Sequence, residues 1–384
     1  MLTPGSFSSA VRGPWLTARL GTWVGVCFGL AFLTGLISHW YYLPDPLFLP
    51  PTRPVWGYRF TQGLHVLSGT AAVPLLLVKL WSVYPRLFER PTLAPVRQAV
   101  LHLLERASIL VLVAASLFQL VAGLANAAQW YPWSFSFRPA HYAGAWIAIG
   151  ALLVHVAVKL PVIRAAYAEK EAGPAPEPDA GSAPAPVDHA GRRTLLRAAF
   201  LASGVAVLSV AGGTVPWLRR VSLLAVRTGE GPQGLPINRA AQAAGVTRTA
   251  RDPAYRLTLR YAGRERVLSL ADLQGMRQRT HELPIACVEG WSASARWTGV
   301  RLADLLELVG APVGADVHVR SLQTRGAFGA TLLPASFAHD DLTLLALRVN
   351  GEVLDLDHGF PCRLIAPNRP GVLQTKWVTR IEVV

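Results

Sequence analysis

The run Cys287-Val288-Glu289-Gly290-Trp291-Ser292, followed by Trp297-Thr298-Gly299, is the most informative stretch of this 384-residue chain. Cys287 is one of three cysteines, which lie far apart and form no Cys-x-x-Cys pair, so zinc ribbons and cysteine-rich modules are excluded. A lone cysteine is most often a buried structural thiol, and a disulfide with Cys362 is a second structural interpretation. A thiolate is also a soft ligand that suits a transition metal.

The residues around this run follow a β pattern. From Pro236 onward, short alternating segments separated by turn signals predict a mixed α/β domain dominated by β structure. Helical periodicity appears mainly at residues 302–309, and Asn350-Gly351 is typical of a hairpin turn. The clearest expected strands cover residues 255–261, 317–322, 344–350, 362–366 and 377–384.

A second stretch, His358-Gly359-Phe360-Pro361-Cys362-Arg363-Leu364-Ile365-Ala366-Pro367, precedes Gly371 and Lys376-Trp377. With the run at Cys287, it resembles the sulfite-oxidase-fold proteins, in particular the bacterial periplasmic methionine-sulfoxide reductase catalytic subunit. The resemblance covers about residues 235–384 and implies a β-rich α/β domain that binds molybdopterin.

The resemblance also implies roles for individual residues. Cys287 is expected to bind molybdenum beside the dithiolene sulfurs of molybdopterin, and Glu289 and Trp291 are expected at the catalytic centre. Arg363 and Lys376 match the family's phosphate-holding residues, because a planar fork and a point charge suit a buried phosphate. Further cofactor contacts are implied for Asn238, Arg239, Ser321, His358, Gln374 and Thr375.

The first half of the chain is much more apolar. The whole chain is 52% hydrophobic and 16% charged, against about 25% charged in ordinary soluble proteins. A bilayer-spanning helix needs about 20 predominantly apolar residues. Five uncharged stretches meet this length and predict five transmembrane helices, at residues 20–43, 60–78, 107–137, 139–158 and 198–218.

The net charge of +14 is concentrated in the apolar half, with +11 in residues 1–227 and +3 in residues 228–384. This distribution indicates membrane orientation rather than a nucleic-acid partner. With the N-terminus in the cytoplasm, 13 Lys and Arg lie in cytoplasmic segments and six on the other side. Five spans then place the residues after about 218 outside the cytoplasm.

These patterns divide the chain into a membrane domain at residues 1–165, a Pro/Ala-rich cytoplasmic linker at 166–193, a fifth transmembrane helix at 194–218 and the β-rich domain at 235–384. The run Gly191-Arg192-Arg193-Thr194-Leu195-Leu196 resembles a twin-arginine export signal. Two positive-inside arginines ahead of an ordinary helix are the alternative interpretation.

Histidines within the spans are functional candidates, because ionisable side chains are costly in a bilayer. His141 and His155 are 14 residues apart on the fourth span, so they share one helix face about 21 Å apart. Two haems stacked across a bilayer need ligands at this separation, each completed by a neighbouring helix. His65 and His141 are expected at the same depth near the outer side, so they are paired as ligands of an outer haem b. His102 and His155 are expected at a similar depth near the inner side, so they are paired for an inner haem b.

Residues 15–160 resemble the four-helix cytochrome b subunits of hydrogenases and formate dehydrogenases. Those subunits carry both haems on a fourth helix with this spacing and take a ligand from the second helix, as His65 would provide. They also have a histidine near the cytoplasmic start of the first span, where this chain has none. His102 is the substitute, so one or two haems are expected; His39 is expected at the membrane interface.

The two halves together predict a membrane-bound molybdopterin-dependent oxidoreductase that passes electrons between a quinol, haem b and an extracytoplasmic molybdenum centre. Reduction of a small S-oxide or N-oxide is the favoured reaction. Sulfite oxidation is the alternative that His358 supports, and it requires an anion pocket. A non-catalytic electron-transfer or docking subunit is the third interpretation. The anion-pocket candidates are Arg296, Arg320, Arg325 and Arg369.

Overall fold

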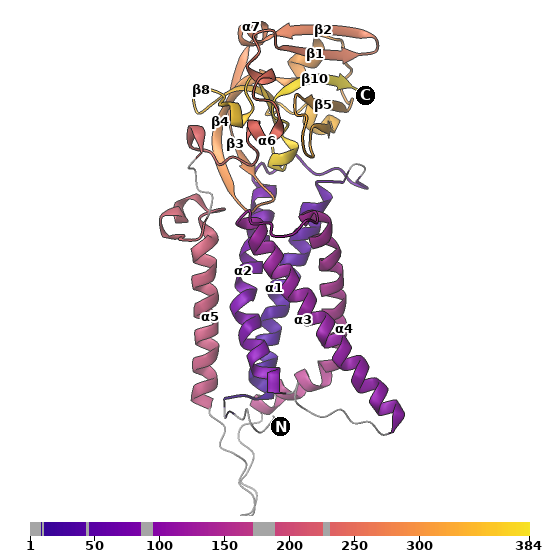
Figure 1. Cartoon of the computed structure of the whole chain (residues 1–384), viewed down its shortest axis with the longest axis vertical. Helices are drawn as coiled ribbons and strands as arrows, with labels where there is room; N and C mark the ends of the chain where they lie inside the picture. The colour runs from indigo at the N-terminus through magenta and orange to yellow at the C-terminus, as the bar shows by residue number, and fades with distance from the viewer. Residues whose placement is uncertain (1–8, 10, 44–45, 86–94, 172–188, 226–230) are drawn as a thin grey trace, which may run out of the picture. The chain divides into compact units, whose positions relative to one another are not determined.

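The computed structural model describes residues 9, 11–43, 46–85, 95–171, 189–225 and 231–384. The chain forms two compact units. The first consists of Met1–Gly35 and Leu64–Val210, and the second of Leu36–Gly63 and Ala211–Val384. Figure 1 shows long helices in the earlier part of the chain and strands in the later part.

The described residues include five helices that are long and apolar enough to cross a membrane, which confirms that prediction. Many of their large apolar side chains are exposed, including Leu33, Leu153 and Leu201. A helix that presents apolar residues all round is typical of a membrane span. The helices are α1 (Pro14–Trp40), α2 (Gly57–Val83), α3 (Val96–Ala127), α4 (Phe137–Glu171) and α5 (His189–Ala211).

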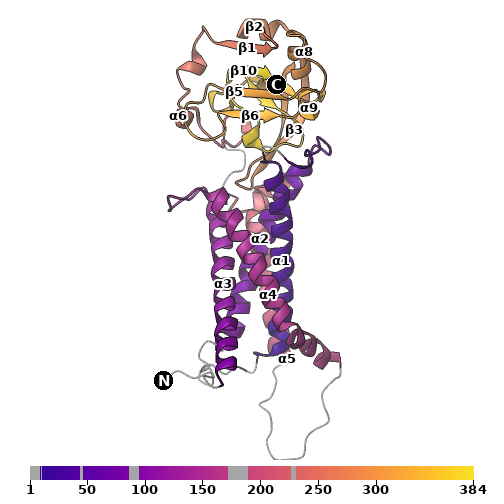
Figure 2. The same cartoon turned by 90° about the vertical axis from the view of Figure 1, so that its right-hand side faces the viewer.

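Within the first unit, a buried cluster joins α1, α2 and α5 through Leu16, Leu75 and Leu196, among others. The helix pair α3 and α4 runs side by side (Figure 2). Gly144 permits this close approach, because a Cβ at that position would lie 3.1 Å from the side chains of Phe118 and Gln119.

The ends of the helices differ from the expected ranges; α3, for example, ends at Ala127, whereas the third span was expected to reach residue 137. Helix α4 continues to Glu171, past Pro161, whereas the fourth span was expected at 139–158. Helix α5 begins at His189 and ends at Ala211, so Arg192 and Arg193 lie inside it. Hydropathy marks only the uncharged part of a helix, whereas backbone hydrogen bonding continues through charged turns. Residues 172–188 of the expected linker lie outside the described residues.

The second unit contains two five-stranded sheets, which confirms a mixed domain dominated by β structure. One has the order β2-β1-β10-β5-β6, and the other has β3-β4-β7-β8 with β9 paired to β7. The strands are β1 (Arg256–Tyr261), β2 (Arg264–Ser269), β3 (Gln278–Ala286), β4 (Ser292–Arg301), β5 (Val317–Ser321), β6 (Ala330–Leu333), β7 (Leu344–Val349), β8 (Glu352–Val353), β9 (Arg363–Ile365) and β10 (Val378–Val383).

The five strands expected from the sequence correspond to β1, β5, β7, β9 and β10, and the expected helix corresponds to α8 (Leu302–Glu307). Asn350 and Gly351 join β7 to β8 with φ angles of 51° and 90°, as a two-residue hairpin turn requires. The longest strands, β3 and β4, were not predicted individually. They pair antiparallel from Gln278 with Val300 to Ala286 with Ser292.

The second unit has three apolar clusters among its described residues, and two of them are large. One packs Leu257, Leu305 and Ile381 with their neighbours between the sheets and the short helices. The other contains Trp291 and Trp297, and Cys287 belongs to it. The second cluster therefore supports the loop between β3 and β4.

Candidate functional site

Cys287 lies in the tight loop that joins β3 to β4. Its backbone N–H donates to the carbonyl of Trp291 at 2.9 Å, and its own carbonyl accepts from Gly290 at 3.0 Å. Gly290 has a φ of 86°, a left-handed conformation that glycine adopts without steric cost. The loop therefore holds the Cys287 side chain in one position, and only 1% of this residue is exposed.

The cysteines form no disulfide; the described residues include all three of them. The disulfide interpretation of Cys287 and Cys362 is therefore wrong. Cys362 instead lies beside Tyr255, whose Oη is 3.0 Å from its Sγ. Burial raises the pKa of the Cys362 thiol to about 12, so this cysteine is a neutral part of the core.

Arg363 and Lys376 bring two cations into the interior near Cys287. Arg363 is 2% exposed; its Nη1 donates to the His358 carbonyl at 3.3 Å, whereas its Nε and Nη2 have no hydrogen-bond partner. Lys376 donates to the carbonyls of Arg239 and Asp357, at 2.6 and 2.8 Å. Buried polar groups are normally hydrogen-bonded, so the orphaned nitrogens of Arg363 indicate a ligand.

Electrostatics connect the three side chains. Burial lowers the pKa of Arg363 to about 9, and the negative charge that Cys287 can carry opposes this shift. Burial also lowers the pKa of Lys376 well below its ordinary value; the charge of Arg363 adds to the shift, and Cys287 again opposes it. An anion bound here would stabilise both cations.

Gly359 gives Arg363 and Lys376 room to lie side by side. Its φ is 116°, and a Cβ at this position would lie 3.1 Å from the Cβ of Arg363 and 3.2 Å from the Cβ of Lys376. No residue with a side chain fits here without displacing one of the cations.

His358 is also part of this site. It is 1% exposed, and its Nε2 donates to the Pro232 carbonyl at 2.7 Å. Burial lowers the pKa of His358 to about 4, and this shift exceeds the opposing effect of the Pro232 hydrogen bond. The imidazole is therefore neutral at pH 7, and it adds no charge next to Arg363.

The other predicted cofactor contacts surround Lys376. The Oγ of Ser321 donates to the Lys376 carbonyl at 2.7 Å. The Arg239 side chain bonds to the carbonyls of Ala243 and Arg325, while its own carbonyl accepts from Lys376. Asn238 is half-buried beside Arg239.

Gln374 and Thr375 are buried directly before Lys376. Gln374 donates to the Arg369 carbonyl at 2.9 Å, and its Oε1 has no hydrogen-bond partner. The Oγ1 atoms of Thr375 and Thr331 are 2.9 Å apart. The Gln374 amide therefore retains an acceptor for a bound group.

Glu289 and Trp291 contact each other within the loop. The Nε1 of Trp291 donates to Oε2 of Glu289 at 2.9 Å, and Trp291 is 4% exposed. This hydrogen bond stabilises the conformation of the loop that carries Cys287. Of the four arginines considered for an anion pocket, Arg369 alone is buried, and the other three are exposed.

The sequence reasoning missed Asn368, which is 3% exposed. It lies in a segment, residues 361–371, in which every residue is buried. Asn368 could have been found from the sequence because two polar side chains, Asn368 and Arg369, follow an expected buried strand.

In the first unit, the rings of His65 and His141 lie edge to face, with their centroids 6.1 Å apart at an interplanar angle of 74°. The Nδ1 of His65 is 2.8 Å from the Ala31 carbonyl, and the Nδ1 of His141 is buried without a partner. Metal-bound histidines commonly donate their second ring N–H to a carbonyl. His65 therefore has the hydrogen bond typical of a metal-bound histidine, whereas the Nδ1 of His141 has no such bond.

The other predicted pair lies beside an ion pair. Lys159 of α4 bonds to Glu105 of α3, and both His102 and His155 are within electrostatic reach of Glu105. His155 is half-buried and His102 is exposed.

A family model described as the oxidoreductase molybdopterin-binding domain matches residues 244–384. This segment contains Cys287, Arg363 and Lys376. Residues 244–384 are therefore similar to this domain family, and the segment is named the molybdopterin domain. This molybdopterin domain includes the loop at Cys287, both buried cations and both sheets.

Individual relatives support this result. Human mitochondrial sulfite oxidase is 32% identical over 136 residues, which are 33% of this chain and 23% of that protein. The putative protein-methionine-sulfoxide reductase subunit YedZ1 of Azospira oryzae is 30% identical over 115 residues, which are 30% of this chain and 43% of that protein. This chain therefore matches about a quarter of the length of the human enzyme and less than half of the bacterial protein.

Among solved structures, the sulfane dehydrogenase SoxCD of Paracoccus pantotrophus matches with 25% sequence identity and a TM-score of 0.31. The match covers 34% of this chain and 38% of that one.

The residues at the site fit molybdopterin. A phosphate needs cationic donors, which Arg363 supplies with two unpaired nitrogens and Lys376 with its ammonium group. A metal bound to the cofactor needs a soft ligand, which the Cys287 thiol supplies. The molybdopterin domain therefore offers both kinds of group within one buried site.

Proposed function

We propose that this chain is a membrane-bound oxidoreductase that passes electrons between a quinol, haem b and a molybdenum centre, and that it reduces an S-oxide or an N-oxide. The observation that carries the proposal is the burial of Arg363 and Lys376 near Cys287. A buried cation without an anion is strongly destabilising. Their retention in the core is explained by an anionic cofactor that they hold.

Each residue has a distinct task in the molybdopterin domain. Cys287 holds the metal through its thiolate, and Glu289 and Trp291 keep its loop in place. Arg363 and Lys376 hold the phosphate, while the remaining site residues line the pterin. When bound, the molybdenum cofactor supplies two-electron oxygen-atom transfer. The pterin contacts are Asn238, Arg239, Ser321, His358, Gln374 and Thr375.

The membrane helices supply the electrons. His65 and His141 hold one haem b, and His102 and His155 hold a second. Oxidation of a quinol to a quinone releases two electrons and two protons. Cleavage of the S=O bond of an S-oxide consumes two electrons and two protons and yields a sulfide and water, so the reaction balances.

The orientation follows from the positive-inside bias of the sequence. The N-terminus lies in the cytoplasm, the five helices cross the bilayer, and the molybdopterin domain lies outside the cytoplasm. The arginines near the start of α5 act as a twin-arginine export signal. Arg192 also has a local role in the first unit, where its guanidinium donates to the carbonyls of Val11 and Arg12 at 3.0 and 2.7 Å.

Sulfite oxidation is the second candidate function. The histidine at position 358 and the similarity to human sulfite oxidase favour it. Sulfite and water would give sulfate, two protons and two electrons, and these electrons and protons would reduce a quinone. Arg369 is the buried arginine available for a substrate anion, but its guanidinium already donates to the Leu332 carbonyl at 2.7 Å.

Metal analysis of the purified full-length protein tests the proposal. We expect molybdenum stoichiometric with the chain, haem bands in the reduced-minus-oxidised spectrum, and quinol-dependent reduction of dimethyl sulfoxide or methionine sulfoxide. Protein without molybdenum would be a docking or electron-transfer subunit. Faster turnover with sulfite than with S-oxides would show that electrons flow from the substrate to a quinone, as in the second candidate function.

A Cys287→Ser variant tests the metal ligand directly. Serine preserves the size of the side chain but removes the soft sulfur, so we expect turnover to fall at least about a hundredfold. Cys27→Ser, in α1, is the matched control and should keep wild-type turnover. Wild-type molybdenum content and turnover in Cys287→Ser would contradict the assignment.

A further inference from the structure

Residues 36–63 belong to the same compact unit as the molybdopterin domain, although the sequence assigns them to the membrane half. Asn368 joins the two segments. Its Oδ1 accepts from the backbone N–H of Tyr58 at 2.5 Å, and its Nδ2 donates to Tyr41 Oη at 2.7 Å and to the Pro51 carbonyl at 2.8 Å. A buried amide with all these bonds made fixes the relative position of its partners.

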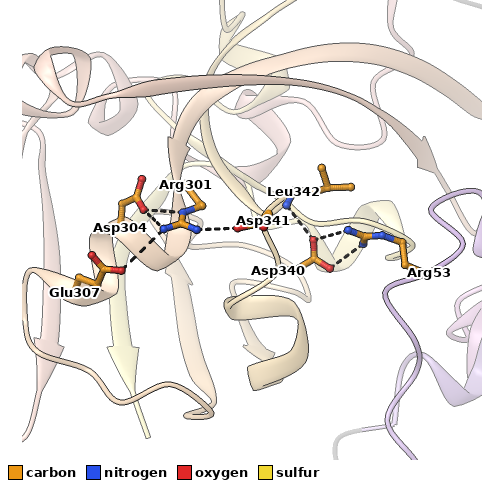
Figure 3. Close-up of polar contacts among 7 residues, drawn as sticks. All are labelled: Arg53, Arg301, Asp304, Glu307, Asp340, Asp341 and Leu342. Atoms are coloured by element: carbon orange, nitrogen blue, oxygen red, sulfur yellow. Dashed lines mark hydrogen bonds and ion pairs between the residues drawn. The ribbon is translucent and has the colours of Figure 1, made fainter.

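An ion pair anchors the same segment a second time. Arg53 contacts Asp340 with both terminal nitrogens, at 2.8 and 3.1 Å, and Asp340 also accepts from the backbone of Leu342 at 2.9 Å (Figure 3). The Asp340 side chain is 8% exposed and that of Arg53 is 51% exposed. The bidentate geometry favours one orientation of the segment.

A third contact reaches the loop that carries Cys287. The Nε2 of Gln62, in α2, donates to the carbonyl of Val288 at 3.3 Å, and the Oε1 of Gln62 accepts from Ser38 Oγ at 3.2 Å. Gln62 is 4% exposed. Val288 directly follows Cys287, so this bond links α2 to the peptide next to the proposed metal ligand.

The other end of the loop is held as well. The backbone N–H of Ser292 donates to the Gly213 carbonyl at 2.8 Å, and its Oγ donates to the Thr214 carbonyl at 3.1 Å. Gly213 and Thr214 follow α5. The Cys287 loop is therefore bonded at both ends to residues at the ends of membrane-length helices.

On the proposed function, we infer that Gln62 is a positioning residue that fixes the Cys287 loop to α2, the helix that carries His65. Gln62 and His65 are three residues apart, and helix neighbours at this spacing lie on one face. Gln62 sets the position of the Cys287 loop and takes no part in the chemistry.

The first experiment needs no cofactor. In cofactor-free full-length protein, N-ethylmaleimide labelling of Cys287 is followed by peptide mass spectrometry. We expect Gln62→Met, which keeps the side chain's length but removes its donor, to increase the labelling rate about tenfold, as loss of one buried hydrogen bond allows. Gln278→Met is the matched control, because the side-chain amide of Gln278 donates to the carbonyls of Leu273 and Met276 and, among the described residues, to no part of the Cys287 loop.

The second experiment uses the loaded enzyme. We expect Gln62→Met to slow reoxidation of the reduced haem by S-oxide about tenfold, while turnover with reduced viologen and the KM for the S-oxide stay within about twofold. A purely structural defect would lower viologen turnover equally. Ser38→Ala removes the hydroxyl that donates to the Gln62 carbonyl oxygen and that also lies 3.3 Å from Tyr58 Oη. It leaves the Gln62 donor in place, so it is the milder variant and should shift both measurements in the same direction.

Unchanged labelling and unchanged haem reoxidation in Gln62→Met would overturn the inference. Failure of the proposed function looks different, because the wild-type protein itself would then lack molybdenum, haem or viologen turnover. The labelling experiment still tests the contact between Gln62 and the Cys287 loop in that case.

Discussion

The guanidinium of Arg363 lies over the ring of Trp297, 5.5 Å from its centroid. Trp297 is fully buried on β4, and Arg363 is on β9. The π face of Trp297 contributes about 2 kcal/mol to a desolvated cation, which is less than the cost of burying an unpaired charge. Without a bound anion, the buried charge of Arg363 therefore lowers the stability of the cofactor-free protein.

We predict that Arg363→Met raises the thermal stability of the cofactor-free protein while it lowers molybdenum content. Replacing a buried charge by an apolar side chain of similar volume is commonly neutral or stabilising, by about 1–4 kcal/mol. Differential scanning fluorimetry and metal analysis measure the two effects. Arg320→Met, an exposed change on β5, should alter neither. Full molybdenum content in Arg363→Met would show that another residue holds the phosphate.

Gly359→Ala should reduce both stability and cofactor content. A side chain at a positive φ costs about 1–2 kcal/mol, and here the added Cβ also meets Arg363 and Lys376. Gly314→Ala separates the two effects, because Gly314 has a φ of 99° with no atom within 4 Å of an added Cβ. Chemical denaturation should detect a loss in both variants, and metal analysis a loss in Gly359→Ala alone. Equal molybdenum in the two variants would contradict this account.

Removal of either outer ligand should remove one haem. We expect His65→Ala and His141→Ala each to lose the same component of the reduced-minus-oxidised spectrum, because an iron that loses one of two axial ligands is held less tightly. His39→Ala, at the end of α1, is the control and should keep that component. Loss of different components in the two variants would mean that His65 and His141 do not share a haem.

The stability of the cofactor-free protein should depend on His358 in acid. Its pKa is about 4 in the folded protein and about 6.5 when unfolded, so the unfolded state binds the extra proton first. Stability is therefore lost as the pH falls from about 6.5 to about 4. Thermal unfolding between these values should show a smaller decline in His358→Asn than in the wild type. His318→Asn is the control, and parallel curves for His358→Asn and the wild type would refute the assignment.

Much of the fold could be predicted because it is encoded locally. The apolar length of the five helices and the short apolar run of β7 are properties of neighbouring residues. Strand β2 was not predicted individually because its first four residues are exposed, so it has no strict inward and outward alternation. Strands β3 and β4 were not predicted individually either, because the loop at Cys287 lacks a short hairpin signal.

The sequence by itself determined the membrane-length helices, the β-rich domain and the motifs at Cys287 and Arg363, because each depends on residues close together in the chain. Only the tertiary structure brought Arg363 and Lys376 together around Gly359. Only the tertiary structure joined the α1–α2 segment to the molybdopterin domain, through Tyr58 and Asn368, which are 310 residues apart. Hydrogen bonds and buried charges act through distance in space, and no local pattern records which distant residues fold into contact.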